Sequence, residues 1–152
     1  MAHRSIRPAE RGDTAVVRDL VRMAYSKYVE RIGKEPAPMR EDYAALIRAG
    51  EVWVLAEGGE VLGVLVMRPA DDHLFVDNVA VAPGQQGKGL GRELLAFAEE
   101  RAEGEGLPEI RLYTNEKMHE NLLAVYARVG FEETGRGVDG GYRRVFMRKR
   151  LS

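Results

Sequence analysis

The spacing of hydrophobic and polar positions changes several times along the 152-residue chain. Val16, Val17, Leu20 and Ala24 recur at helical spacing, and Asp13 precedes them as the expected N-cap. The same reasoning predicts further helices over 42–48, 87–104 and 122–129. Runs rich in β-branched and aromatic residues predict strands over 5–7, 52–56, 61–67, 74–81, 110–114, 131–136 and 142–150.

Glycine and proline separate these elements. The Gly-Gly centre of residues 57–60 suits a primed hairpin turn, Gly130 is a good residue to end the 122–129 helix, and residues 137–141 join the last two strands. The order βααβββαβαββ predicts an α+β domain with a mixed, mostly antiparallel sheet, whose parallel part comes from the central strand–helix–strand crossover. No repeat or linker interrupts the chain, so residues 1–152 are expected to form a single domain.

Composition excludes several classes of function. The net charge is −1 and the sequence pI about 6.3, so no basic excess favours a nucleic-acid or membrane partner. The basic tail 143–150 is interleaved with apolar residues and is interpreted as a strand. Cysteine is absent, which excludes disulfides, thiolate catalysis and Cys-based zinc sites. With no signal peptide or membrane span in the pattern, the cytoplasm is the expected location.

The most informative segment is the glycine-rich turn after the 74–81 strand. Gly87, Gly89 and Gly91 alternate just as a helix begins, although each glycine costs a helix about 1 kcal/mol relative to alanine. A phosphate lying against the first-turn N–H groups explains them, since the helix dipole also favours a negative charge there. A P-loop is excluded because Gly89 follows Lys88, and a dinucleotide fingerprint is disfavoured by Arg92 and by the lack of alternating β and α units. A flexible strand-to-helix corner is the plainer alternative.

Residues 86–91, Gln-Gly-Lys-Gly-Leu-Gly, match the Q/R-x-x-G-x-G/A motif of the GNAT superfamily of N-acetyltransferases, and Val-Ala-Val-x-Pro precedes them as in that family. Tyr126, Gly130 and Phe131 resemble the Y-x-x-x-G-F signature on the family's later helix. The chain therefore resembles a GNAT domain over nearly its whole length. The resemblance implies a GNAT-like central sheet with helices on both faces.

The resemblance also implies an activity: transfer of the acetyl group of acetyl-CoA, used as co-substrate without a metal, to a primary amine that attacks directly in a ternary complex. The pyrophosphate is expected on the amides of Gln86 to Gly91, and main-chain groups of the strand before them are expected to hold the pantetheine arm. The residues expected to bind acetyl-CoA are Val79, Ala80, Val81, Gln86, Gly87, Lys88, Gly89, Leu90, Gly91, Arg92 and Asn121.

For catalysis, the resemblance makes Tyr126 the candidate general acid toward the CoA sulfur. Packing is the alternative, because Tyr126 shares one helical stripe with Leu122, Val125 and Val129. Asp77 is the candidate base. It could equally anchor a cationic acceptor or face solvent, and the weaker rivals for the base are Glu30 and Glu35.

One position departs from the family pattern. Many members carry an asparagine two turns before the tyrosine, where it holds the pantetheine amide, and this chain has His119 there. His119, Asn121 and Asn115 are the three candidates for that contact. A metal role for His119 is not expected, since the chain's other histidines offer no ligand-spaced partner. The strands that splay to admit the pantetheine arm are expected to part near Asn78 and Tyr113.

The amine acceptor is the least determined part of the expected reaction. An aromatic and proline-rich stretch could wall a pocket for it, or its tyrosines could only pack a helix. A small-molecule or peptide amine is the expected partner, and a homodimer stays open. The other functions considered are a CoA-binding sensor without turnover and a general phosphate or nucleotide binder. The acceptor-side candidates are Tyr25, Tyr28, Arg31, Pro36, Pro38, Met39 and Tyr43.

Overall fold

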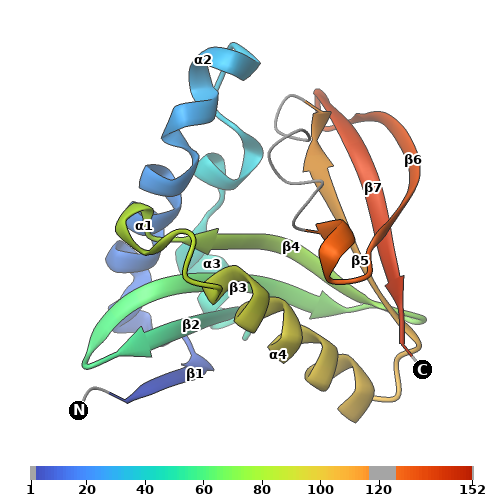
Figure 1. Ribbon diagram of the computed structural model, residues 1–152. Helices are drawn as coiled ribbons and strands as arrows, with labels where there is room; N and C mark the ends of the chain where they lie inside the picture. The colour runs from blue at the N-terminus through green and yellow to red at the C-terminus, as the bar shows by residue number, and fades with distance from the viewer. Residues whose placement is uncertain (1–2, 117–125, 152) are drawn as a thin grey trace. The chain divides into compact units, whose positions relative to one another are not determined.

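The computed structural model describes residues 3–116 and 126–151, and its strands form a seven-stranded sheet in the order β1-β2-β3-β4-β5-β7-β6 (Figure 1). Among the strand pairs that the structure describes, β4 with β5 is parallel and the others are antiparallel. Helices flank this sheet. The mixed, mostly antiparallel α+β fold expected from the sequence is therefore confirmed.

The elements follow the predicted order, with one short helix added after the first. The strands are β1 (Arg4–Pro8), β2 (Val52–Glu57), β3 (Glu60–Pro69), β4 (Leu74–Val81), β5 (Glu109–Asn115), β6 (Glu132–Asp139) and β7 (Tyr142–Arg150). The helices are α1 (Thr14–Tyr25), α2 (Val29–Ile32), α3 (Tyr43–Arg48) and α4 (Leu90–Gly104), with 3₁₀ turns at Arg11–Asp13, Ser26–Tyr28, Ala37–Arg40 and Pro83–Gln85. Of the helix predicted over 122–129, residues 122–125 lie outside the described residues and 126–128 are helical.

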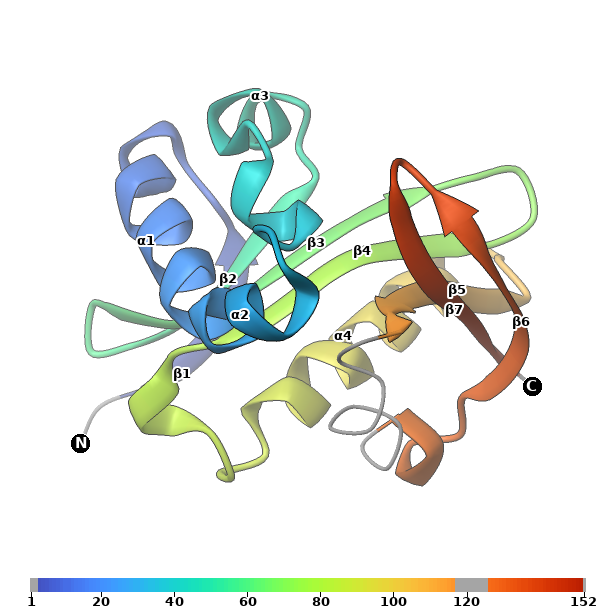
Figure 2. The same ribbon diagram turned by 90° about the horizontal axis from the view of Figure 1, so that it is seen from above.

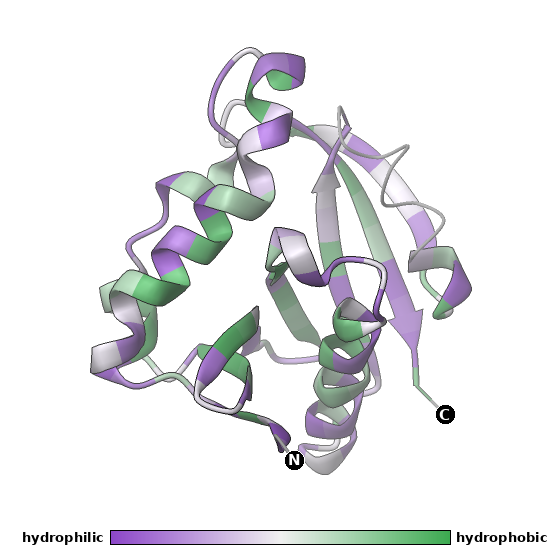
Figure 3. Cartoon of the chain, turned by 60° about the vertical axis from the view of Figure 1, so that its left-hand side comes forward, coloured by the Kyte–Doolittle hydropathy of each residue, from purple (hydrophilic) through white to green (hydrophobic). Residues whose placement is uncertain are grey.

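The chain divides into two compact units, the first formed by 1–67 and 78–97, the second by 68–77 and 98–152. In the first unit, α1 and α3 lie side by side over one face of β2 and β3 (Figure 2). The hydrophobic stripe of α1, visible as one side of its ribbon in Figure 3, supplies buried Val17, Leu20 and Val21. These side chains pack on valines of β2 and β3 and on Ala80 of β4, which makes this face the main core of the unit.

The opposite face of β2 and β3 is covered by the start of α4. Leu90, Leu94 and Leu95 are buried there, as their helical spacing predicted. Trp53 of β2 packs on Phe97 with ring centroids 5.1 Å apart. Gly63 of β3 allows α4 to come close, because a Cβ at this position would lie 3.0 Å from Leu94 Cδ1.

We expect Gly63→Ala to lower the free energy of unfolding by about 1–3 kcal/mol, the usual cost of overfilling a packed core. Leu94 is fully buried, so it has little room to move away from the added methyl group. Gly135→Ala in β6 is the matched control, since its Cβ would meet nothing within 4 Å. Urea unfolding of both variants checks the prediction, and equal midpoints would contradict it.

Asp13 was expected to cap α1, and this prediction is wrong in its mechanism. Asp13 occupies the N-cap position, but its side chain makes no capping hydrogen bond. Its carboxylate instead accepts from the Arg7 guanidinium at 2.8 Å and from the Glu10 N–H at 2.7 Å. The Arg7 hydrogen bond holds the pKa of Asp13 below its usual value. The carboxylate therefore ties β1 to the 3₁₀ turn that precedes α1, and it does not cap the helix.

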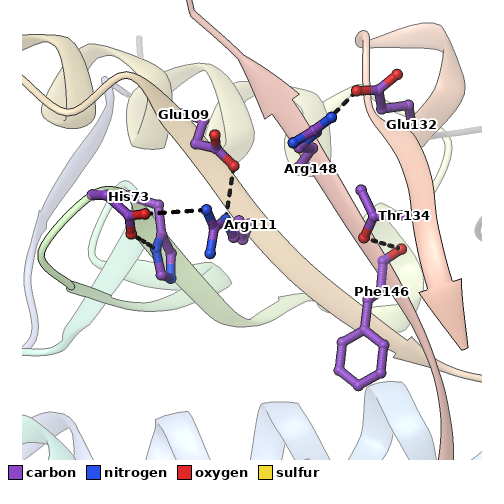
Figure 4. Close-up of polar contacts among 8 residues, drawn as sticks. His73, Glu109, Arg111, Glu132, Thr134, Phe146 and Arg148 are labelled. Atoms are coloured by element: carbon purple, nitrogen blue, oxygen red, sulfur yellow. Dashed lines mark hydrogen bonds and ion pairs between the residues drawn. The ribbon is translucent and has the colours of Figure 1, made fainter. Parts of the chain in front are cut away.

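The second unit is built on the first half of β4 with β5, β7 and β6. Ion pairs join its strands, among them Arg148 of β7 with Glu132 of β6 at 3.0 Å (Figure 4). The turn before β4 is held to β5 through Asp72, which lies 2.8 Å from His73 Nδ1 and 3.4 Å from Arg111. The basic tail is confirmed as a strand, β7, with Val145 and Met147 buried.

Two turns show how glycine fixes the hairpins. Gly58 and Gly59, with φ of 59° and 85°, close the β2–β3 hairpin and confirm the primed turn. The β6–β7 hairpin turns at Gly140 and Gly141, with φ of 60° and 82°. Its strands therefore continue further into residues 137–141 than the sequence indicated.

Candidate active site

The glycine-rich segment lies in the first unit, between β4 and α4. After β4, Ala82 N–H donates to Leu62 O at 2.9 Å and Gln85 N–H donates to Ala82 O at 2.8 Å, so the chain enters the turn through a fixed 3₁₀ bend. The Gln86 side-chain amide reaches the Val81 carbonyl at 3.4 Å. These contacts hold the start of the segment against the strand from which it comes.

Gly87 and Gly89 both have positive φ, 85° and 81°, in the region that side chains rarely adopt. The helix predicted from residue 87 therefore begins only at Leu90, and the first two glycines shape the loop before it. A Cβ at either position would meet nothing within 4 Å, so the backbone conformation, not crowding, requires glycine. The loop keeps an open face beside the backbone.

The first turn of α4 presents N–H groups at the end of this loop. Glu93 N–H donates to Gly89 O at 3.1 Å, so the N–H groups of Leu90, Gly91 and Arg92 precede the helical bonding pattern. Fully buried Leu90 anchors the turn, whereas Lys88 and Arg92 are exposed. Lys88 Nζ contacts Gln85 Oε1 at 3.2 Å. Amides that precede the helical bonding pattern, a helix dipole and two cations favour an anion at this place.

The strand before the loop carries a buried polar side chain, Asn78, which is 6% exposed. Its Oδ1 accepts from the Tyr25 hydroxyl at 2.8 Å, and its Nδ2 donates to the Tyr43 hydroxyl at 3.1 Å. The Tyr43 hydroxyl in turn donates to Pro38 O, and the Tyr25 hydroxyl also lies 3.1 Å from Val79 O. Asn78 therefore ties the acceptor-side candidates of α1 and α3 to β4.

Sequence reasoning named Asn78 only as a place where two strands were expected to part, and not as a buried hydrogen-bonding residue. A usable signal was present: Val76, Asn78 and Ala80 alternate on the buried face of β4, so a polar residue stood in a core register. Of the remaining acceptor-side candidates, Tyr28 is buried, with Lys27 and Arg31 over its ring at 5.2 and 5.5 Å.

Asp77 lies in the second unit, with a side chain only 7% exposed. Its carboxylate accepts from the Tyr113 hydroxyl at 3.2 Å and lies 3.4 Å from the Arg68 guanidinium. Burial, together with the negative charge of Asp77, raises the pKa of Tyr113, against an opposing effect of Arg144. Tyr113 is therefore a neutral phenol that donates to Asp77 near neutral pH. The solvent-facing alternative for Asp77 does not fit this burial.

Tyr113 sits within a stack of side chains from three strands. Its ring lies 5.4 Å from Phe75, 6.3 Å from Phe146 and 3.8 Å from the guanidinium carbon of Arg144. Arg144 is 8% exposed, and sequence reasoning had treated it only as part of a basic strand. Arg143 and Arg144 are adjacent in the strand, so they point to opposite faces of the sheet. The sequence alone left open which of the two faces inward.

Tyr126 belongs to the short helical stretch 126–128 and is half-buried. Its ring packs edge-on against Phe131 at 5.8 Å, and Phe131 N–H donates to Tyr126 O at 3.0 Å. Gly130, with φ of 95°, ends the stretch as its sequence position predicted. His119 and Asn121 lie outside the described residues, and Asn115, at the end of β5, stays a candidate for the pantetheine contact.

Glu30 and Glu35, the rival bases, lie on or after α2 in the first unit. Glu35 is 3.9 Å from Arg22 with both side chains largely exposed, and Glu30 is exposed. Within residues 3–116 and 126–151, no three His, Asp or Glu side chains gather where they could hold a metal ion, and no helix is long and apolar enough to span a membrane. That the reaction needs no metal stays a prediction.

Comparison with known proteins agrees with this arrangement. The family model described as "Acetyltransferase (GNAT) family" matches residues 16–131. Mouse N-acetyltransferase 8 is 24% identical in an alignment 118 residues long, which covers 73% of this chain and 51% of that protein. The chain spans about half or less of the length of the curated relatives it matches.

Solved structures of acetyltransferases share the fold. The PaiA N-acetyltransferase from Thermoplasma acidophilum, in complex with coenzyme A, superposes with a TM-score of 0.80 at 16% identity, covering 98% of this chain and 99% of that one. A GNAT family acetyltransferase from Elizabethkingia anophelis with acetyl-CoA bound gives 0.73 at 21% identity, covering 97% and 98%. The fold is that of an acetyltransferase, and the chain belongs to the GNAT family.

Proposed function

We propose that this protein is an N-acetyltransferase that moves the acetyl group of acetyl-CoA to a primary amine by direct attack in a ternary complex. The observation that carries the proposal is the loop from Gln86 to Gly91. Two positive-φ glycines leave its backbone uncovered, and it leads into first-turn amides that have no helical acceptor. Such a site suits a pyrophosphate better than a neutral ligand.

The residues present fit acetyl-CoA as co-substrate. The amides from Gln86 to Gly91 would hold the pyrophosphate, with Lys88 and Arg92, both exposed, as counter-charges. The pantetheine arm would lie along the main chain of Val79 to Val81. Asn121, Asn115 or His119 would hold its amide. Acetyl-CoA supplies the activated acetyl group, and the protein's own groups orient it.

Three proton and charge movements are assigned to this chain. The amine enters as an ammonium group, since its pKa is about 10 in water, and Asp77 takes up its proton directly or through water. A main-chain N–H of the Val79–Val81 strand donates to the developing oxyanion. The C–N bond forms, the C–S bond breaks, and Tyr126 gives its proton to the leaving thiolate. The second proton that the nitrogen loses on becoming an amide is released to water, from which the Tyr126 phenolate is reprotonated.

The acceptor is a small-molecule or peptide amine. Asn78 holds Tyr25, Tyr43 and Pro38 in one hydrogen-bonded chain, which favours the packing alternative for these tyrosines, because Asn78 and the proposed base Asp77 alternate to opposite faces of β4. A single domain over residues 1–152, a cytoplasmic location and the lack of a nucleic-acid partner belong to the same proposal.

The test is an amine panel with acetyl-CoA, read by the release of the CoA thiol. A thiol reagent reports CoA alone, because the chain has no cysteine. Amine-dependent release that exceeds acetyl-CoA hydrolysis would support the proposal. Tight binding of CoA with no release for any amine would favour the sensor without turnover, and equal affinity for CoA, ATP and NAD would favour a general phosphate binder.

A further inference from the structure

Arg144 is a buried arginine near the start of β7. Its side chain is 9% exposed, whereas that of Arg143, the preceding residue on the opposite face, is 75% exposed. Moving a guanidinium out of water is costly unless partners replace its hydration. The contacts of Arg144 therefore have to offset this cost.

Its partners replace little of that hydration. In the part of the chain that the structure describes, the carboxylate nearest to Arg144 is Asp139, at 3.4 Å, and the Asp139 side chain is 65% exposed. An ion pair so open to water contributes little. The other contacts are with two tyrosines: the guanidinium carbon lies 3.8 Å from the Tyr113 ring centroid and 5.9 Å from that of Tyr142, and Arg144 also hydrogen-bonds to the Tyr113 hydroxyl. A guanidinium has a planar fork of N–H donors, and one phenol oxygen and two ring faces leave some of those donors for another acceptor.

A second, opposite charge lies at the same tyrosine. The Tyr113 hydroxyl donates to Asp77, while the Tyr113 ring face carries Arg144. Asp77 already accepts from Tyr113 and lies near Arg68, but a carboxylate has lone pairs for further donors. One ring thus separates a buried carboxylate from a buried guanidinium. This pairing is complementary to a molecule that carries both an ammonium and a carboxylate group.

We propose that Arg144 binds the carboxylate of the acceptor while Asp77 receives its amine, so that the acceptor is a small amine bearing a carboxylate, of the amino-acid class. The assignment rests on the proposed acetyl transfer and names its substrate class. The Arg144 fork matches a carboxylate through two parallel hydrogen bonds. A polyamine would instead bring a second cation toward Arg144, which like-charge repulsion disfavours.

The experiment compares amine acceptors that differ only in the carboxylate. Methionine and methioninamide, phenylalanine and phenylalaninamide, and 4-aminobutyrate and 4-aminobutanamide are each assayed with acetyl-CoA. In the unmodified protein, kcat/KM for the best acid should exceed that for its amide by about ten- to a hundredfold, the usual effect of a charged hydrogen bond. Equal values for acid and amide would overturn the proposal.

Variants assign the preference to Arg144. In Arg144→Gln the ratio of kcat/KM for the acid to kcat/KM for its amide should fall close to one, chiefly through a higher KM for the acid. Arg144→Lys, which keeps the charge and loses the planar fork, should give an intermediate ratio. Arg143→Gln is the matched control and should keep the full ratio. A ratio that persists in Arg144→Gln would overturn the proposal.

A binding measurement separates this inference from the proposed activity. Thermal unfolding is followed with N-acetylmethionine and with N-acetylmethioninamide, in the unmodified protein and in Arg144→Lys. Stabilisation by the acid alone, lost in the variant, supports the carboxylate subsite even if no amine in the panel is acetylated. No difference between acid and amide would overturn the subsite, whereas acetylation of amides and diamines alone would retain the activity and reject the substrate class.

Discussion

Replacing Tyr126 by phenylalanine is expected to lower kcat by about 10²–10⁴-fold, the range that a general acid contributes. The change removes one hydroxyl and keeps the ring that packs edge-on against Phe131. Packing should therefore survive, and the affinity for acetyl-CoA should hardly change. Steady-state kinetics with a competent amine measure the effect, with a solvent-isotope or burst experiment to show that chemistry limits turnover.

Phe131→Leu is the control for Tyr126→Phe. It removes the ring that contacts Tyr126 and leaves the hydroxyl in place, so it should lower stability more than kcat. If Tyr126→Phe leaves kcat unchanged in a chemistry-limited assay, Tyr126 has only the packing role. A higher KM at constant kcat would make it a binding residue.

Gly89→Ala is expected to weaken acetyl-CoA binding by at least about tenfold, the factor that corresponds to 1.4 kcal/mol. A side chain at φ of 81° costs about 1–2 kcal/mol, so the loop would leave this conformation or hold it under strain. A loop that leaves this conformation displaces the first-turn amides of α4 from the proposed pyrophosphate site. A loop that keeps it puts the new methyl group into the open space beside the backbone where the pyrophosphate is expected. Titration of acetyl-CoA by calorimetry, on protein shown to be folded, gives the affinity.

Two control variants separate the effect of the position of Gly89 in the loop from the effect of backbone strain. Gly59→Ala places a methyl group at nearly the same φ, 85°, in the β2–β3 turn, with open space around it. Gly84→Ala adds a methyl group within the same segment at an unstrained position with equal space. Both should bind acetyl-CoA as the unmodified protein does. Equal affinity of all three variants for acetyl-CoA would mean that residues 86–91 do not hold the pyrophosphate.

The elements were predictable because their hydrophobic patterns are locally decisive. Leu90, Leu94, Leu95, Ala98 and Ala102 lie at helical spacing, and all five are buried in α4. The start of that helix was placed too early, since glycine spacing does not tell a helical first turn from a loop with positive φ. Only the backbone angles of Gly87 and Gly89 distinguish the two.

The site was predictable only where a linear motif carries it. The loop proposed to hold the pyrophosphate is contiguous, so residues 86–91 alone were enough to predict it. Asn78 and Arg144 depend on partners distant in the chain, Tyr43 and Tyr113, and no spacing rule connects such pairs. Charge patterning also did not single out Arg144, because basic residues in a terminal strand are usually solvated, whereas this one is buried.

Trp53, the only tryptophan of the chain, packs on Phe97 within the first unit. Its emission is therefore a spectroscopic reporter of the docking of α4 on β2, while circular dichroism reports on both units together. If residues 1–152 unfold as one cooperative domain, the two signals should trace coincident melting curves. Separate midpoints would mean that the loop proposed to bind acetyl-CoA and the Asp77–Arg144 pair belong to independently melting parts. Tryptophan fluorescence would then follow the loop alone.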